Sequence, residues 1–193
     1  MAYTETIQQL NDARRRILEI RAEMRELQAG IEPEQVEDYE FTTTAGPVRL
    51  SQLFGDHDEL ILIHNMGSGC VYCTLWADGL NGVVDHLEDR AAFVLSSPET
   101  PDEQRKFADS RGWRFRMVSH GGTSFAQDMG YYTDAGEFAG FQPGVSVFRK
   151  DGDRVLRLSD TAFGPDDDFC AVWHLYNLFP EGADGWGPKY KYI

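Results

Sequence analysis

Two cysteines separated by two residues, Cys70 and Cys73, follow an apolar run and precede a helical pattern. The apolar run covers residues 60–66 and is typical of a buried strand, while residues 67–69 form a short Gly-Ser-Gly loop. Beyond the cysteines, apolar side chains recur at helical spacing, at Trp76, Leu80, Val83, Val84 and Leu87. The pattern therefore predicts a strand, a tight turn and two cysteines on the first turn of a helix. No other feature constrains the fold as closely.

The predicted position at a helix N-terminus gives the two sulfur atoms a specific chemistry. Unpaired backbone N–H groups and the helix dipole favour negative charge there. A thiolate in such a place can have its pKa lowered from about 8.5 to roughly 3.5–7.5. The two-residue spacer lets the second sulfur reach the first, so we expect Cys70 to attack a disulfide and Cys73 to resolve the intermediate. The partner would be a protein or a small-molecule thiol or disulfide, and no bound cofactor is needed.

Two other interpretations of the cysteine pair stay open. As a metal site, Cys70 and Cys73 supply only two soft ligands, whereas a structural zinc ion takes four. The chain has no second pair of this spacing, so His64 or His120 would have to join, and we expect no metal. The third interpretation is a non-enzymatic interaction domain that makes little use of the cysteines. The remaining cysteine, Cys170, lies in an apolar segment and is expected to be a buried free thiol.

Composition indicates a globular protein and excludes several kinds of partner. The 193 residues are 41% hydrophobic and 12% aromatic, which suffices for one domain with an appendage. A net charge of −14 repels phosphate backbones, so we expect no nucleic-acid partner. No apolar run reaches the roughly 20 residues that span a bilayer, and the N-terminus shows no secretory signal. We therefore expect a cytoplasmic protein without membrane association, in which a close cysteine pair is more often catalytic or metal-binding than structural.

Periodicity predicts three parts: an N-terminal helix over residues 1–30, a linker over 31–38 and an α/β domain over 39–193. The helix carries an apolar seam at spacings of three and four, formed by Leu10, Ala13, Ile17, Ile20, Met24 and Leu27. Such a seam invites association, so we expect it either to pack on its own domain or to pair two copies in a homodimer.

The α/β domain alternates the two kinds of pattern. A short strand or a turn is expected at residues 48–53, and strands are expected at residues 60–66, 91–96, 115–118, 144–150 and 154–158. Helices are expected at residues 74–88, 101–111, 124–129 and 166–178. Strand–helix alternation that ends in a hairpin and a closing helix predicts a central mixed β-sheet flanked by helices.

The order of the motifs resembles the DUF899 family, a thioredoxin-like bacterial family of undefined function. The similar motifs run along essentially the whole chain, at residues 39–41, 50–54, 64–66, 69–73, 76–78, 112–115, 143–148 and 173–180. The resemblance implies a thioredoxin-like, peroxiredoxin-related α/β fold with the N-terminal helix as an extension. It implies no established substrate.

The resemblance to thioredoxin-like proteins also points to residues around the cysteines. A proline before the corresponding strand is cis in those proteins and packs against the disulfide, which implies a cis bond before Pro143. His64 stands where thioredoxins carry a buried acidic residue that handles the proton of the second cysteine. It is expected either to carry that proton or to be a core histidine with a structural hydrogen bond. Tyr72, Gln142 and Trp76 are expected to contact the substrate, although Trp76 also fits the core stripe of its helix.

Two departures from related families bear on the activity. Residues 67–69 form a shorter loop than family members usually have before the cysteines, which implies a more open site. The peroxiredoxin pattern places Thr or Ser three residues, and Pro seven residues, before the reactive cysteine. This chain has Gly67 and Ile63 at those positions. Because the missing side chains shape the peroxide pocket, we do not expect efficient peroxidase activity.

Overall fold

The N-terminal apolar seam lies on one long helix, α1 (Tyr3–Ala29), as its periodicity predicts. The computed structural model describes residues 3–136 and 139–192. The chain divides into two compact units, Met1–Pro33 and Glu34–Ile193. In α1 no described residue is buried. The helix stops at Gly30, whose N–H group donates to the carbonyl groups of Glu26 and Leu27.

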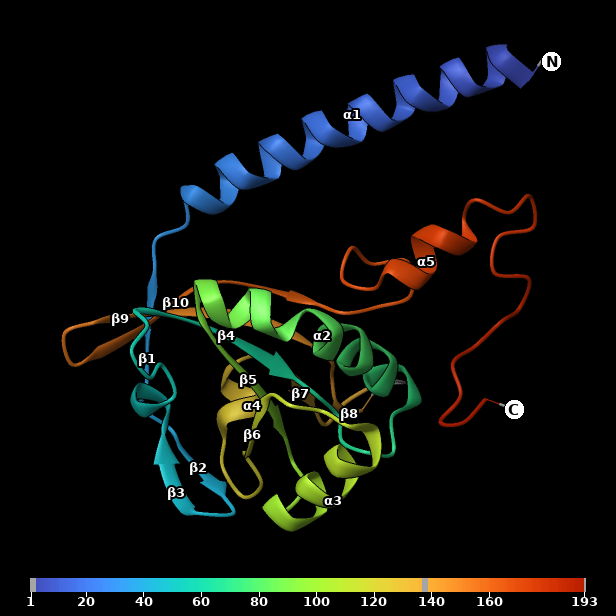
Figure 1. The fold of residues 1–193 in the computed structure, drawn as a ribbon. Coiled ribbons are helices and arrows are strands. Elements are labelled where there is room, and N and C mark those ends of the chain that lie inside the picture. The colour runs from blue at the N-terminus through green and yellow to red at the C-terminus, as the bar shows by residue number, and fades with distance from the viewer. Residues whose placement is uncertain (1–2, 137–138, 193) are drawn as a thin grey trace. The chain divides into compact units, whose positions relative to one another are not determined.

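The second unit is built around a mixed sheet, which confirms the predicted α/β class (Figure 1). In the described part of the chain the sheet has the strand order β1-β10-β9-β4-β5-β6-β2-β3. These strands are β1 (Glu34–Val36), β2 (Glu40–Thr43), β3 (Gly46–Arg49), β4 (Glu59–His64), β5 (Ala92–Ser97), β6 (Arg116–Ser119), β9 (Gly144–Asp151) and β10 (Arg154–Ala162). β4, β5 and β6 run parallel, and the other pairings are antiparallel. A separate hairpin consists of β7 (Tyr132–Thr133) and β8 (Gly140–Phe141).

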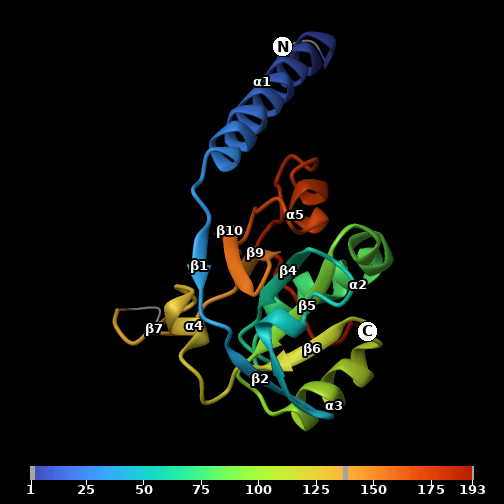
Figure 2. The same cartoon turned by 90° about the vertical axis from the view of Figure 1, so that its left-hand side faces the viewer.

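Helices cover both faces of the sheet (Figure 2). They are α2 (Val71–Arg90), α3 (Pro101–Arg111), α4 (Phe125–Asp128) and α5 (Ala171–Tyr176), with a short 3-10 helix, η1, at Leu50–Gln52. Side chains alternate along β4, so Ile63 packs with α2, α3 and α5 on one face. Leu60 and Leu62 pack with α4 on the other face. The sheet thus separates two cores, and the cysteine helix belongs to only one of them.

Local sequence signals explain where α3 begins and ends. Thr100 is its N-cap and forms a capping box with Glu103, and Pro101 occupies the first turn. Gly112 ends the helix with a left-handed φ of 68°, which glycine adopts without steric cost. Each of these features follows from residues within one helical turn.

Several elements differ from the sequence-based expectation. Residues 50–52, within the expected segment 48–53, form the 3-10 helix η1, and the strands β2, β7 and β8 were not expected. Residues 34–36, expected in the linker, form β1 and pair with β10 at the sheet edge. The closing helix is shorter than the predicted 166–178, because the Asp167 carboxylate accepts hydrogen bonds from the N–H groups of Gly164 and Phe169 and holds a turn instead. Among the described residues, no helix is long and apolar enough to cross a membrane.

Candidate functional site

The two cysteines lie at the N-terminus of α2, directly after the loop that follows β4. Cys70 is the N-cap residue, and its sulfur accepts a hydrogen bond from the backbone N–H of Cys73 at 3.0 Å. The two residues form a disulfide with a Cα–Cα distance of 5.2 Å, within the usual range for such bonds. Cys73 is buried, with 2% of its surface exposed, whereas Cys70 is half-buried. A partner can therefore reach Cys70 but not Cys73.

The loop before the cysteines is held from two sides. The side-chain oxygen of Asn65 accepts from the N–H of Gly67 at 2.8 Å. The Glu99 carboxylate accepts from the N–H of Ser68 at 2.9 Å and from its hydroxyl at 2.5 Å. Gly67 has a φ of +100°, and a Cβ built on it would lie 2.9 Å from the Glu99 Cδ atom. The close approach of Glu99 and the backbone angle together require glycine at position 67.

Glu99 was not identified from the sequence, although one signal could have pointed to it. β4 and β5 are parallel neighbours, so their carboxyl ends meet at the same edge of the sheet. The loop after β4 leads to Cys70, and the loop after β5 carries Glu99. Polar residues just beyond the end of β5 were therefore candidates for contact with the cysteine loop.

Aromatic side chains surround the first turn of α2. Tyr72 is 37% exposed and stacks on Trp173 at a centroid distance of 6.2 Å. Its hydroxyl lies 3.7 Å from the Cβ position built on Gly187. Trp76 is buried and packs against Phe163 at 5.4 Å, as expected of the helical core stripe. Of the two aromatic residues expected to contact substrate on this helix, only Tyr72 presents a substantial surface.

His64 lies in the core on the sheet face opposite α2. Its Nε2 atom and the Ser146 hydroxyl are 2.8 Å apart, and its ring stacks on Tyr131 at 3.7 Å. Burial, followed by the charges of His120 and Arg157, holds the pKa of His64 well below its ordinary value, so the ring is neutral at pH 7. Its Nδ1 atom has no hydrogen-bond partner among the described residues. This is the environment of a core histidine, and proton transfer from Cys73 stays a prediction.

The expected cis bond before Pro143 is wrong, because no peptide bond among the described residues is cis. The N–H of Gln142 donates to the Tyr131 carbonyl at 2.8 Å, and the Pro143 carbonyl accepts from Phe163 at 2.9 Å. These bonds carry an extended chain straight into β9, a course that the commoner trans bond supports. The next residue, Gly144, pairs with the last residue of β4, so Pro143 still lies beside the strand that leads to the cysteines.

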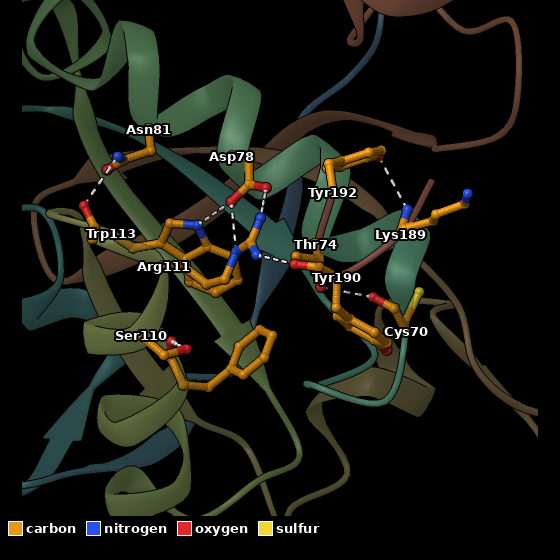
Figure 3. Close-up of polar contacts among 12 residues, drawn as sticks. Cys70, Thr74, Asp78, Asn81, Ser110, Arg111, Trp113, Lys189, Tyr190 and Tyr192 are labelled. Atoms are coloured by element: carbon orange, nitrogen blue, oxygen red, sulfur yellow. Dashed lines mark hydrogen bonds and ion pairs between the residues drawn. The ribbon is translucent and has the colours of Figure 1, made fainter. Parts of the chain in front are cut away.

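The C-terminal segment is tied to the helices that carry the site (Figure 3). Asp78, two turns beyond Cys70 on α2, binds the Arg111 guanidinium through two nitrogen atoms and accepts from the Trp113 indole at 2.8 Å. The hydrogen bonds with Asp78 raise the pKa of Arg111. The same guanidinium donates to the backbone carbonyl of Tyr190 at 2.7 Å. No local sequence pattern predicts this contact, since 79 residues separate its two partners.

No group of three or more His, Cys, Asp or Glu residues in the described ranges is arranged to hold a metal ion. Cys170 is buried in the core cluster that also contains Trp76 and Trp173. Burial raises the pKa of its thiol. Of the three cysteines, Cys70 alone combines partial exposure with a position at the N-terminus of the long helix α2.

Comparison with known proteins supports the fold and identifies a family. A family described as "Bacterial protein of unknown function (DUF899)" matches residues 2–192. Peroxidoxin BcpB from Mycobacterium tuberculosis is 23% identical, with 67% of this chain and 84% of that chain covered and a TM-score of 0.54. Reduced Prx3 from Vibrio vulnificus is 14% identical, with coverages of 71% and 89% and a TM-score of 0.56. A search among curated proteins finds no match.

These likenesses confirm the predicted thioredoxin-like, peroxiredoxin-related fold. A third solved structure, a peroxiredoxin-like protein from Aquifex aeolicus, is 13% identical, with coverages of 67% and 74% and a TM-score of 0.54. At these identities the structures show a shared fold only.

Proposed function

The chain belongs to DUF899, a family of bacterial proteins of unknown function, and from its cysteine site we propose that it is a thiol–disulfide oxidoreductase. One observation carries the proposal: a half-buried Cys70 is joined to a buried Cys73 at the N-terminus of a long helix. The helix favours a thiolate at Cys70, and the asymmetry in exposure separates the attacking sulfur from the resolving one. Protein or small-molecule disulfides are the proposed substrates.

The proposed reaction proceeds by two exchanges at sulfur. In the reduced protein, the Cys70 thiolate attacks one sulfur of the substrate disulfide, and the other substrate sulfur leaves as a thiolate. Cys73 gives its proton to the first substrate thiolate, and the resulting Cys73 thiolate attacks the Cys70 sulfur of the mixed disulfide, which releases the second substrate sulfur as a thiolate. Two electrons pass to the substrate, and the Cys70–Cys73 disulfide forms. The Cys73 N–H, which donates to the Cys70 sulfur, supports negative charge on that atom.

The substrate is proposed to be contacted by Pro143, Gln142 and Tyr72. Pro143 precedes Gly144, which pairs with the last residue of β4, so its backbone is proposed to steady the mixed disulfide. Tyr72 is proposed to contact the group attached to the substrate sulfur, because it stands between the cysteines and is exposed. His64 is proposed to act as a neutral core histidine, because its ring stacks on Tyr131 on the sheet face opposite α2 and burial holds its pKa well below the ordinary value.

Disulfides are proposed as substrates in preference to peroxides. The positions that carry Thr or Ser and Pro in the peroxiredoxin pattern hold Gly67 and Ile63. The N–H of Gly67 is already bound to Asn65, and Ile63 is buried in the core that α2 covers. Neither residue offers a hydroxyl group to a peroxide.

The exposed seam of α1 favours a second role, association of two copies. Leu10, Ile17, Ile20, Met24 and Leu27 are each 45–68% exposed. We propose that two such helices pair along this seam, because burial of its apolar area is the main energy available to a helix without buried residues of its own. A non-enzymatic interaction protein that dimerises in this way is the alternative to the oxidoreductase.

Disulfide reduction by cysteine variants tests the proposed enzyme. Wild-type protein and Cys170→Ser, the matched control, should both catalyse reduction of insulin by dithiothreitol. Cys70→Ser should be inactive, and Cys73→Ser should accumulate a mixed disulfide at Cys70, detected by mass spectrometry. Equal activity of wild type and Cys70→Ser would remove the enzymatic interpretation. Normal turnover by Cys73→Ser would remove the resolving role of Cys73.

A further inference from the structure

We propose that Glu99 is a positioning residue that holds the loop before Cys70 and, through its charge, biases the cysteine pair toward donating electrons. The inference deepens the proposed function and rests on it for the identity of the redox pair. It concerns a property of the two sulfur atoms that can be measured without a physiological substrate.

The contacts of Glu99 are directed at the cysteine loop. One carboxylate oxygen accepts both the N–H and the hydroxyl of Ser68, at 2.9 and 2.5 Å. The side chain also fills the space in which any side chain at position 67 would lie. The N–H of Cys70 donates back to the Gly67 carbonyl at 3.1 Å, so the loop between Glu99 and Cys70 is a single closed turn. Movement of the carboxylate would therefore be transmitted to the residue that carries the attacking sulfur.

The charge of Glu99 lies close to Cys70, and no ion pair among the described residues offsets it. Two residues of chain span at most about 7 Å, so the carboxylate bound to Ser68 lies on the order of 10 Å from Cys70. No ion pair found in the described ranges includes Glu99. The Arg111 guanidinium is bound to Asp78, about 12 Å along α2 from Cys70, and is neutralised there.

A negative charge at this position opposes the effect of the helix N-terminus on Cys70. The helix end favours the thiolate, whereas a nearby carboxylate disfavours a second negative charge. A less stable thiolate makes the reduced pair less stable, and the equilibrium then favours the disulfide together with reduced substrate. Glu99 thus lowers the reduction potential of the pair and makes the protein a better reductant.

The test compares Glu99→Gln with wild type in the full chain. Glutamine keeps an oxygen that can accept from Ser68 and removes only the charge. Asp102→Asn is the matched control, because Asp102 is exposed on the first turn of α3 and no contact of it with the cysteine loop is found. The pair is equilibrated in glutathione buffers, and the reduced fraction is measured by alkylation and mass spectrometry. The rate of Cys70 alkylation is followed against pH in a Cys73→Ser background.

Glu99→Gln should stabilise the reduced pair two- to tenfold relative to wild type, a range expected for one charge on the order of 10 Å away. Tenfold corresponds to a rise of about 30 mV in reduction potential. The midpoint of the pH dependence of Cys70 alkylation should move to lower pH in Glu99→Gln, and Asp102→Asn should change neither quantity. An unchanged or lower potential in Glu99→Gln, or an equal change in Asp102→Asn, would overturn the inference.

The test also covers a Glu99→Gln variant that does not fold and a protein that reduces no disulfide. If Glu99→Gln does not fold, Glu99→Asp and Glu99→Asn can be compared instead, because both side chains are one methylene shorter and only Asp is charged. The Asn variant should have the higher reduction potential. The result is also separable from the proposed function. A potential shift in a protein that reduces no disulfide would leave the role of Glu99 intact. An active enzyme whose reduction potential is the same in wild type and Glu99→Gln would overturn this inference but not the proposed function.

Discussion

Gly144→Ala should destabilise the protein strongly, because the first residue of β9 has no room for a methyl group. A Cβ at position 144 would lie 2.2 Å from the Tyr131 ring and 2.6 Å from the Thr161 carbonyl oxygen. The Thr161 oxygen belongs to β10, which is paired with β9. It cannot move away without loss of hydrogen bonds between these two strands. The ring cannot move freely either, since it stacks on His64 at 3.7 Å and its hydroxyl donates to Val145.

The magnitude follows from these two contacts. Overpacking of a filled core costs about 1–3 kcal/mol. Loss of the aromatic stack adds about 0.5–1.5 kcal/mol, so the free energy of unfolding should fall by about 1.5–4.5 kcal/mol. At Gly79 the same substitution should raise the free energy of unfolding. Gly79 is exposed within α2, and no atom lies within 4 Å of its Cβ position. There alanine should stabilise the helix by about 0.5–1 kcal/mol.

Urea denaturation followed by tryptophan fluorescence measures both variants. With a slope of about 2–3 kcal/mol per molar urea, the midpoint of Gly144→Ala should fall by roughly 1 M and that of Gly79→Ala should rise slightly. A Gly144→Ala protein as stable as wild type would refute the packing described around Tyr131 and His64. Destabilisation by Gly79→Ala would refute the reasoning about the open helix surface.

Three further predictions concern reactivity, pH and assembly. Reduced Cys70 should be alkylated much faster than Cys170 at pH 7, because burial covers the Cys170 thiol and raises its pKa; equal rates would contradict the assignment. Stability should decline as pH falls from about 6.5 toward 4, since burial lowers the pKa of His120 to about 4 and the unfolded chain binds the proton first; His120→Gln should flatten this decline. In sedimentation the wild type should be a dimer, and the double variant Ile17→Glu, Met24→Glu should be a folded monomer. A wild type that stays monomeric at high concentration would contradict the dimer proposal.

Local chemistry made much of this fold predictable. The capping box at Thr100, the proline that follows it and the glycine at position 112 each act within one turn of α3, and the helix has the expected bounds. The cysteine turn was predictable for the same reason, because the apolar strand, the glycine loop and the helical stripe are consecutive in the chain. Such features depend on neighbours in sequence, so the sequence alone reveals them.

Contacts between distant segments explain what could not be predicted. Residues 34–36 form β1 only because they pair with β10, which lies more than 100 residues away in the sequence. The trans bond before Pro143 lies between a hydrogen bond of Gln142 to Tyr131 and one of Phe163 to Pro143, which the resemblance to thioredoxin-like proteins did not include. Glu99 became part of the site only through the parallel pairing of two strands. In each case the partner is chosen by tertiary packing, which overrides local preference.

Electron transfer from the reduced cysteine pair to a disulfide is the central claim, and single turnover measures it most directly. Fully reduced protein is mixed with excess oxidised glutathione, quenched by alkylation at intervals and analysed by mass spectrometry. A mixed disulfide is expected to appear first at Cys70. One Cys70–Cys73 disulfide should then form for every two substrate thiols released, with Cys170 still reduced. A mixed disulfide formed first at Cys73, or thiols released without formation of the Cys70–Cys73 bond, would contradict the proposed function.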